Sequence, residues 1–165
     1  MPITYFSIEK VIEIHALAMQ VSGDDVQGSN PDALGLLESA LHHVQNDDYY
    51  PTLADKLTHL FFSGCKSHAF VEGNKRMALS LSAEFLRGNG FDPVVTKFMR
   101  DMENVVVCVA DNKIDKVFLG QIIGNFLLGN EDEAIKLRIL EAVEQVRIDQ
   151  EKRDAENQPP PKADG

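Results

Sequence analysis

The stretch from His68 to Arg76 gathers side chains that together could act on a phosphate ester. His68 is a candidate general base, because imidazole is the side chain that most readily accepts a proton near neutral pH. Glu72 is the only acid in the stretch, and a carboxylate is a common protein ligand of Mg²⁺. Lys75 and Arg76 follow it with positive charge that suits phosphate oxygens. These residue types at this spacing predict a site for a polyphosphate bound with Mg²⁺.

Gly73 and Asn74 stand where a helix is expected to begin. The first turn of a helix presents unpaired N–H groups and the positive end of the helix dipole. Glycine also lets the backbone approach an anion closely. We therefore expect the four residues from Gly73 to Arg76 to bind phosphates, with the side-chain amide of Asn74 as a further donor.

Less specific interpretations stay open for two of these side chains. Glu72 could be a charged residue at a helix start that is stabilised by the helix dipole alone. His68 could be a hydrogen-bonded histidine of the core. A zinc site formed by His59, Cys65 and His68 is a weaker alternative, because their spacing matches no common zinc pattern.

The elements that must position this stretch are two helices, one on each side of it. An apolar stripe at helical spacing precedes it, and consists of Leu53, Leu57, Leu60, Phe61, Gly64 and Cys65. A second face follows it, and consists of Ala78, Leu81, Ser82 and Phe85. His68 falls at the next step of the first stripe, so we expect it to point inward where that helix ends. Phe70 is expected to anchor the loop in the core.

The rest of the chain has helical periodicity as well, which predicts an all-α bundle with the motif loop between two central helices. Ser7, Asn30-Pro31 and Asp115 are expected to begin three of the other helices. Residues 1–130 are expected to form the domain. Residues 131–157 are expected to form a charged helical extension, and 158–165 a disordered tail.

The composition sets limits on the function. The chain has 165 residues, of which 44% are hydrophobic, and this suits one domain with a sizeable core. Its formal net charge of −10 disfavours a general nucleic-acid binder. The two cysteines fit a reducing compartment, and no apolar run approaches the ~20 residues that span a bilayer. We expect a cytoplasmic protein with no signal peptide and no direct nucleic-acid or membrane partner.

The motif resembles that of the Fic/Doc family, H-x-F-x-[D/E]-[G/A]-N-[G/K]-R. Every defined position is matched, by His68, Phe70, Glu72, Gly73, Asn74, Lys75 and Arg76. The flanks, at residues 35–41, Tyr50-Pro51 and 85–90, resemble the Doc (death on curing) branch, and the resemblance covers roughly Ile3 to Phe126.

The resemblance implies roles for these residues in a reaction that uses ATP and Mg²⁺. His68 would be the base, and Lys75 and Arg76 would complete the catalytic set. Glu72 would hold the metal ion. The nucleotide would be bound by Phe70, Gly73, Asn74, Lys75 and Arg76.

Two positions favour the Doc branch over the Fic branch. Lys75 replaces the second glycine of the Fic motif, and Leu79 stands where that motif has a second arginine. Doc-branch toxins are kinases of elongation factor Tu that arrest translation, and they are paired with a small antitoxin. The resemblance therefore implies phosphoryl transfer from Mg-ATP to a Ser/Thr hydroxyl, with elongation factor Tu and a Phd-like antitoxin as partners. The alternatives are an AMP transferase of the Fic type and a non-catalytic binding module with the Doc fold.

Overall fold

Most of the helices begin at a side chain that accepts hydrogen bonds from their first N–H groups. Ser7 accepts a hydrogen bond from the Lys10 amide, and Asp115 accepts one from the Phe118 amide. Thr52 and Asp55 form a capping box, in which each side chain accepts a hydrogen bond from the other residue's backbone N–H. The helix starts that the sequence predicts at Ser7, Asn30-Pro31 and Asp115 are confirmed.

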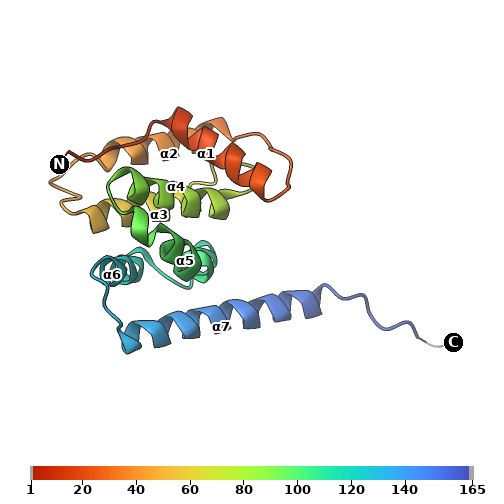
Figure 1. The fold of residues 1–165 in the computed structure, drawn as a ribbon. Helices are drawn as coiled ribbons and strands as arrows, with labels where there is room; N and C mark the ends of the chain where they lie inside the picture. Colours follow the sequence, from red (N-terminus) through yellow and green to blue (C-terminus); the bar gives the residue numbers. More distant parts are fainter. Residues whose placement is uncertain (1, 164–165) are drawn as a thin grey trace.

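The computed structural model describes residues 2–163, and within this range it is an all-α bundle, as predicted (Figure 1). Its elements, in chain order, are α1 (Ile8–Val21), α2 (Pro31–His43), α3 (Leu53–Lys66), α4 (Asn74–Gly88), the 3₁₀ helix η1 (Asp92–Val94), α5 (Val95–Ala110), α6 (Lys116–Leu127) and α7 (Glu133–Glu156). No helix of the described residues is both long enough and apolar enough to cross a membrane.

The helices are arranged around α3 and α4, which carry the motif loop between them. Figure 1 shows α1 and α2 on one side of this central pair and α5 and α6 on the other. The core between them includes Phe61, Leu81 and Phe85, which are fully buried. Each end of the motif loop is therefore attached to a helix that has neighbours on both sides.

Gly64 sets how closely α3 approaches α4. A Cβ atom at this position would lie 2.8 Å from the Cβ of Ala78 on α4, which is closer than real Cβ atoms come. A glycine in α3 is therefore required for this contact, and the contact fixes the start of α4 relative to the end of α3.

The long helix α7 lies beyond α5 and α6, and its C-terminal part extends past them (Figure 1). Ala142 is buried, and four apolar side chains pack against the core, namely Ile135, Ile139, Val143 and Val146. Asp149 forms an ion pair with Lys113 at 2.6 Å. The division into a domain over 1–130 and an extension over 131–157 stays a prediction. Residues 158–163 carry no helix, and 164–165 lie outside the described residues, so the disorder predicted for 158–165 also stays a prediction.

We predict that Gly64→Ala lowers the free energy of unfolding by about 1–3 kcal/mol, because the added methyl group overpacks the α3–α4 contact. Urea denaturation would measure the change. Gly124→Ala in α6 is the matched control, since a Cβ there meets nothing within 4 Å. It should leave stability unchanged or raise it by up to ~1 kcal/mol. Equal effects of the two substitutions would contradict the close contact.

Candidate functional site

The motif loop begins with a sharp turn at His68, and this corrects one expectation from the sequence. Helix α3 ends at Lys66, with Ser67 as its C-cap, so His68 is not a further step on the apolar face. His68 has a φ of 51°, in the left-handed region that non-glycine residues seldom adopt. The turn leaves its side chain exposed and buries the next two residues, Ala69 and Phe70. The expected inward direction of His68 is wrong, and the imidazole is open to a substrate.

Phe70 fixes the loop through a stacked contact with His15 of α1. The two ring centroids are 3.7 Å apart and the ring planes differ by 6°. The same imidazole donates a hydrogen bond from Nε2 to the backbone carbonyl of Glu72, at 2.7 Å. His15 is fully buried, so the loop is attached to α1 at two points. Phe70 lies in the hydrophobic core, so it anchors the loop there as expected. Only 4% of its surface is exposed, and the cofactor-binding role expected for it stays a prediction.

In the sequence, His15 stands among apolar residues at helical spacing, and no motif there indicates a function. The only signal for a role was a histidine among apolar residues at helical spacing, which is also typical of an ordinary core residue.

Asn74 holds the loop closed at its other end. Its Oδ1 accepts a hydrogen bond from the Phe70 amide at 3.1 Å, and its Nδ2 donates one to the Phe70 carbonyl at 2.8 Å. These two bonds give the side chain a structural role in the loop, and its expected role as a phosphate donor stays a prediction. The amide spans the loop and fixes the backbone on which His68 is carried.

Gly73 is required at the start of α4 for two reasons. Its φ of 82° lies in the left-handed region that favours glycine. A Cβ at this position would also lie 2.4 Å from Sδ of Met19 and 3.1 Å from Nε2 of His15. Within the described residues, no side chain caps α4. Its first N–H groups are therefore available to an anion, beside Lys75 and Arg76.

A short segment before α2 runs antiparallel to the motif loop. Ser29 and Phe70 form an isolated β-bridge. The Asn30 amide donates to the Ala69 carbonyl at 2.9 Å, and the Val71 amide donates to the Gly28 carbonyl at 3.0 Å. These bonds satisfy two backbone groups of the loop, and the turn-rich sequence around Gly28 gave no sign of them.

The charged residues of the motif are all exposed, and they differ in their partners. Arg76 donates from Nη1 to Oδ2 of Asp24 at 2.6 Å, and the same nitrogen lies 3.2 Å from Sδ of Met19. Lys75 forms no ion pair with any described residue. Glu72 directs its carboxylate to solvent while its carbonyl is held by His15, so the side chain is free to hold a Mg²⁺ ion at the start of α4.

His59 and Cys65 have surroundings that do not suit the alternative zinc site. Nδ1 of His59 lies 2.9 Å from Nζ of Lys116, and its ring packs on Tyr50 with centroids 4.4 Å apart. Burial, together with the charge of Lys116, lowers the pKa of His59 to about 4. Burial raises the pKa of Cys65 to about 12, so its thiol does not ionise at neutral pH and is a poor metal ligand.

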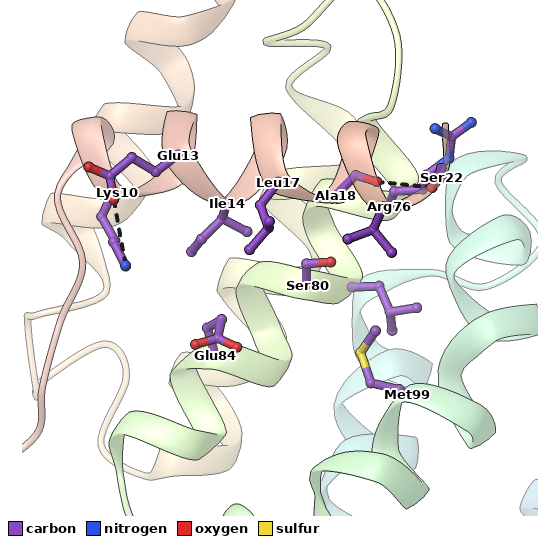
Figure 2. A pocket seen from close by; sticks show the side chains of 12 residues that line it. Lys10, Glu13, Ile14, Leu17, Ala18, Ser22, Arg76, Ser80, Glu84 and Met99 are labelled. Atoms are coloured by element: carbon purple, nitrogen blue, oxygen red, sulfur yellow. Dashed lines mark hydrogen bonds and ion pairs between the residues drawn. The ribbon is translucent and has the colours of Figure 1, made fainter. Parts of the chain in front are cut away.

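An open groove runs from the motif between α1 and α4. Its volume is about 470 Å³, and Ile14, Leu17 and Ala18 of α1 line one side (Figure 2). Ser80 and Glu84 line it from α4, and Met99 from α5 (Figure 2). Arg76 also lines this groove, so a phosphate at the start of α4 would have a largely apolar surface next to it.

Comparison with known families identifies the part of the chain that carries the site. Residues 5–86 match the family model described as the Fic/DOC family. The matched segment contains α1, α2, α3, the motif loop and nearly all of α4. No curated protein gives a significant match to the chain.

We predict that Gly73→Ala destabilises the protein by more than the left-handed conformation alone explains. That conformation costs an alanine about 1–2 kcal/mol, and the contact with Met19 adds to it. Gly129→Ala separates the two effects, because Gly129 has a φ of 70° and open space around its Cβ position. Thermal and urea unfolding of both variants would measure the difference. If Gly73→Ala loses no more stability than Gly129→Ala does, the Met19 side chain moves away from the added methyl group at no cost.

We also predict that Asp24→Asn strengthens the binding of Mg²⁺-tripolyphosphate by a few-fold. An anion must compete with Asp24 for Arg76, and an exposed ion pair contributes about 0.2–1 kcal/mol. Titration calorimetry at low ionic strength would measure the dissociation constant, and the effect should shrink at high salt. Asp25→Asn is the control, since it removes the same charge from the neighbouring position. If Asp24→Asn and Asp25→Asn bind Mg²⁺-tripolyphosphate equally well, the ion pair between Asp24 and Arg76 does not weaken anion binding.

Proposed function

From the match over residues 5–86, which supports membership of the Fic/Doc family, we propose that this protein transfers a group from Mg-ATP to a protein hydroxyl. Transfer of a phosphorus group depends mainly on positioning and on stabilising the charge of the phosphate oxygens. The proposal rests above all on one observation. The exposed imidazole of His68 and the uncapped, basic start of α4 are held on the same short loop.

We propose that the reaction is phosphoryl transfer. A Ser/Thr hydroxyl oxygen attacks the γ-phosphorus, the bond from that phosphorus to the β–γ bridging oxygen breaks, and ADP leaves. His68 accepts the hydroxyl proton. Lys75, Arg76 and the first N–H groups of α4 hold the phosphate oxygens. Mg²⁺, held by Glu72, would neutralise charge on the phosphates.

Lys75 and Leu79 favour phosphoryl over AMP transfer. Leu79 is half-buried and lines the groove between α1 and α4, one helical turn after Lys75. It therefore offers an apolar surface where an arginine of the Fic motif would offer a charge. Lys75 places its charge at the start of the helix instead. We propose that this arrangement favours attack at the terminal phosphorus.

The branch suggests the biological role. We propose a Doc-type toxin of the cytoplasm that phosphorylates elongation factor Tu, arrests translation and is neutralised by a Phd-like antitoxin. These proposals rest on the resemblance of the motif and its flanks to the Doc branch.

We predict that label passes from γ-labelled Mg-ATP, and not from α-labelled Mg-ATP, to a protein in a bacterial translation extract. The physical reason is that only the terminal phosphoryl group moves in a kinase reaction. Gel separation and autoradiography of the two reactions would measure the transfer.

His68→Ala is the control for this experiment, and it should lower the rate by about 10²-fold or more through loss of the general base. Because His68 is exposed, the variant should stay folded. Transfer from the α position alone would identify an AMP transferase instead. The same variant can be expressed in cells. If neither label is transferred in the extract and cells that express His68→Ala still stop growing, the protein acts as a non-catalytic binding module.

A further inference from the structure

A second hollow lies between α4 and α5, has a volume of about 530 Å³, and adjoins the groove along α1, with which it shares Arg76, Leu79 and Met99. Lys75, Arg76 and Leu79 line it from α4. From α5 it is lined by Thr96, Met99, Arg100, Glu103, Val106 and Val107. The two basic residues of the motif therefore open onto a space that extends away from the loop, along a helix outside the matched segment.

Arg100 gives this hollow a third positive charge. Its side chain is 71% exposed, and its one ion pair among the described residues is a 4.0 Å contact with Asp101. Asp101 is itself bound by Lys97, on the previous turn of the same helix. The guanidinium of Arg100 is thus weakly engaged. Glu103 is the one acid that lines the hollow, against three cations.

Apolar side chains make up much of the remaining lining of the hollow, and they include Leu79, Met99 and Val106. No charged residue of α4 beyond Arg76 lines the hollow. Arg100 supplies a further positive charge from the facing helix α5.

We propose that Arg100 is a further phosphate-binding residue, and that the hollow between α4 and α5 takes the trailing part of a polyphosphate whose reacting end lies at the motif. This inference rests on the proposed function for the identity of the substrate, an Mg-nucleoside triphosphate. The planar guanidinium suits it, since it donates two parallel hydrogen bonds to phosphate oxygens. An acidic segment of the target protein is the competing occupant. We favour the polyphosphate because the cations converge from two helices on one small hollow.

The test compares Arg100→Gln with Lys152→Gln, which removes an exposed positive charge from α7 and leaves the Lys97–Asp101 ion pair intact. Titration calorimetry with Mg²⁺-tripolyphosphate, Mg-ATP and adenosine would give the dissociation constants. We expect Arg100→Gln to weaken the binding of the two polyphosphates about five- to tenfold, in keeping with the loss of one ionic hydrogen bond. Adenosine binding should not change. Lys152→Gln should stay within about twofold of the wild type, and Arg100→Lys should recover part of the loss.

The outcomes separate this inference from the proposed reaction. If Arg100→Gln binds tripolyphosphate and Mg-ATP as well as Lys152→Gln does, the inference is overturned even where the wild type transfers label. An unchanged polyphosphate affinity with a raised KM for the target protein would assign Arg100 to that protein. If tripolyphosphate binding depends on Arg100 but no label is transferred, the phosphate-binding role of Arg100 stands and the proposed phosphoryl transfer is wrong. A wild type that binds neither polyphosphate overturns both.

Discussion

The contact between His15 and the motif loop is the constraint on which the rest of the site depends. One buried imidazole stacks on Phe70 and donates to the carbonyl of Glu72, so a single side chain of α1 fixes both the apolar and the polar part of the loop. A smaller residue at position 15 would leave the Phe70 ring without its partner, and an apolar one would leave a carbonyl without its donor. Gly73 belongs to the same contact, because any side chain there would displace the imidazole or Met19.

The loop combines a rigid backbone with exposed functional side chains. Asn74 and the segment at Gly28 satisfy the backbone groups, and Phe70 occupies the core. This leaves His68, Glu72, Lys75 and Arg76 exposed, on a loop whose backbone is held by other residues. The left-handed conformation of His68 fits this division. It costs of order 1 kcal/mol, which the surrounding bonds offset, and it turns the imidazole outward.

Helix starts could be predicted from the sequence because the capping signals are local. Ser7, Thr52 and Asp115 each interact with residues within three positions of themselves. The direction of His68 could not be predicted, since it depends on where α3 stops, and the apolar stripe gave no stop at Lys66. The roles of His15 and of Gly28 could not be predicted either. They are contacts between segments far apart in the chain, and such contacts leave no periodic pattern.

The positive charge at the start of α4 is local, because the chain as a whole is negatively charged. The protein has a formal net charge of −10, and Asp24 already occupies one nitrogen of Arg76. A phosphate would therefore need several cations within a short range, since more distant charges are screened beyond about 8–10 Å. Lys75 forms no ion pair among the described residues, so an anion can bind it without displacing a carboxylate, whereas at Arg76 it must compete with Asp24. A glycine at this position would leave the loop with Arg76 alone, already bound to Asp24. On physical grounds, then, Lys75 also supplies the charge that makes the start of α4 attractive to an anion.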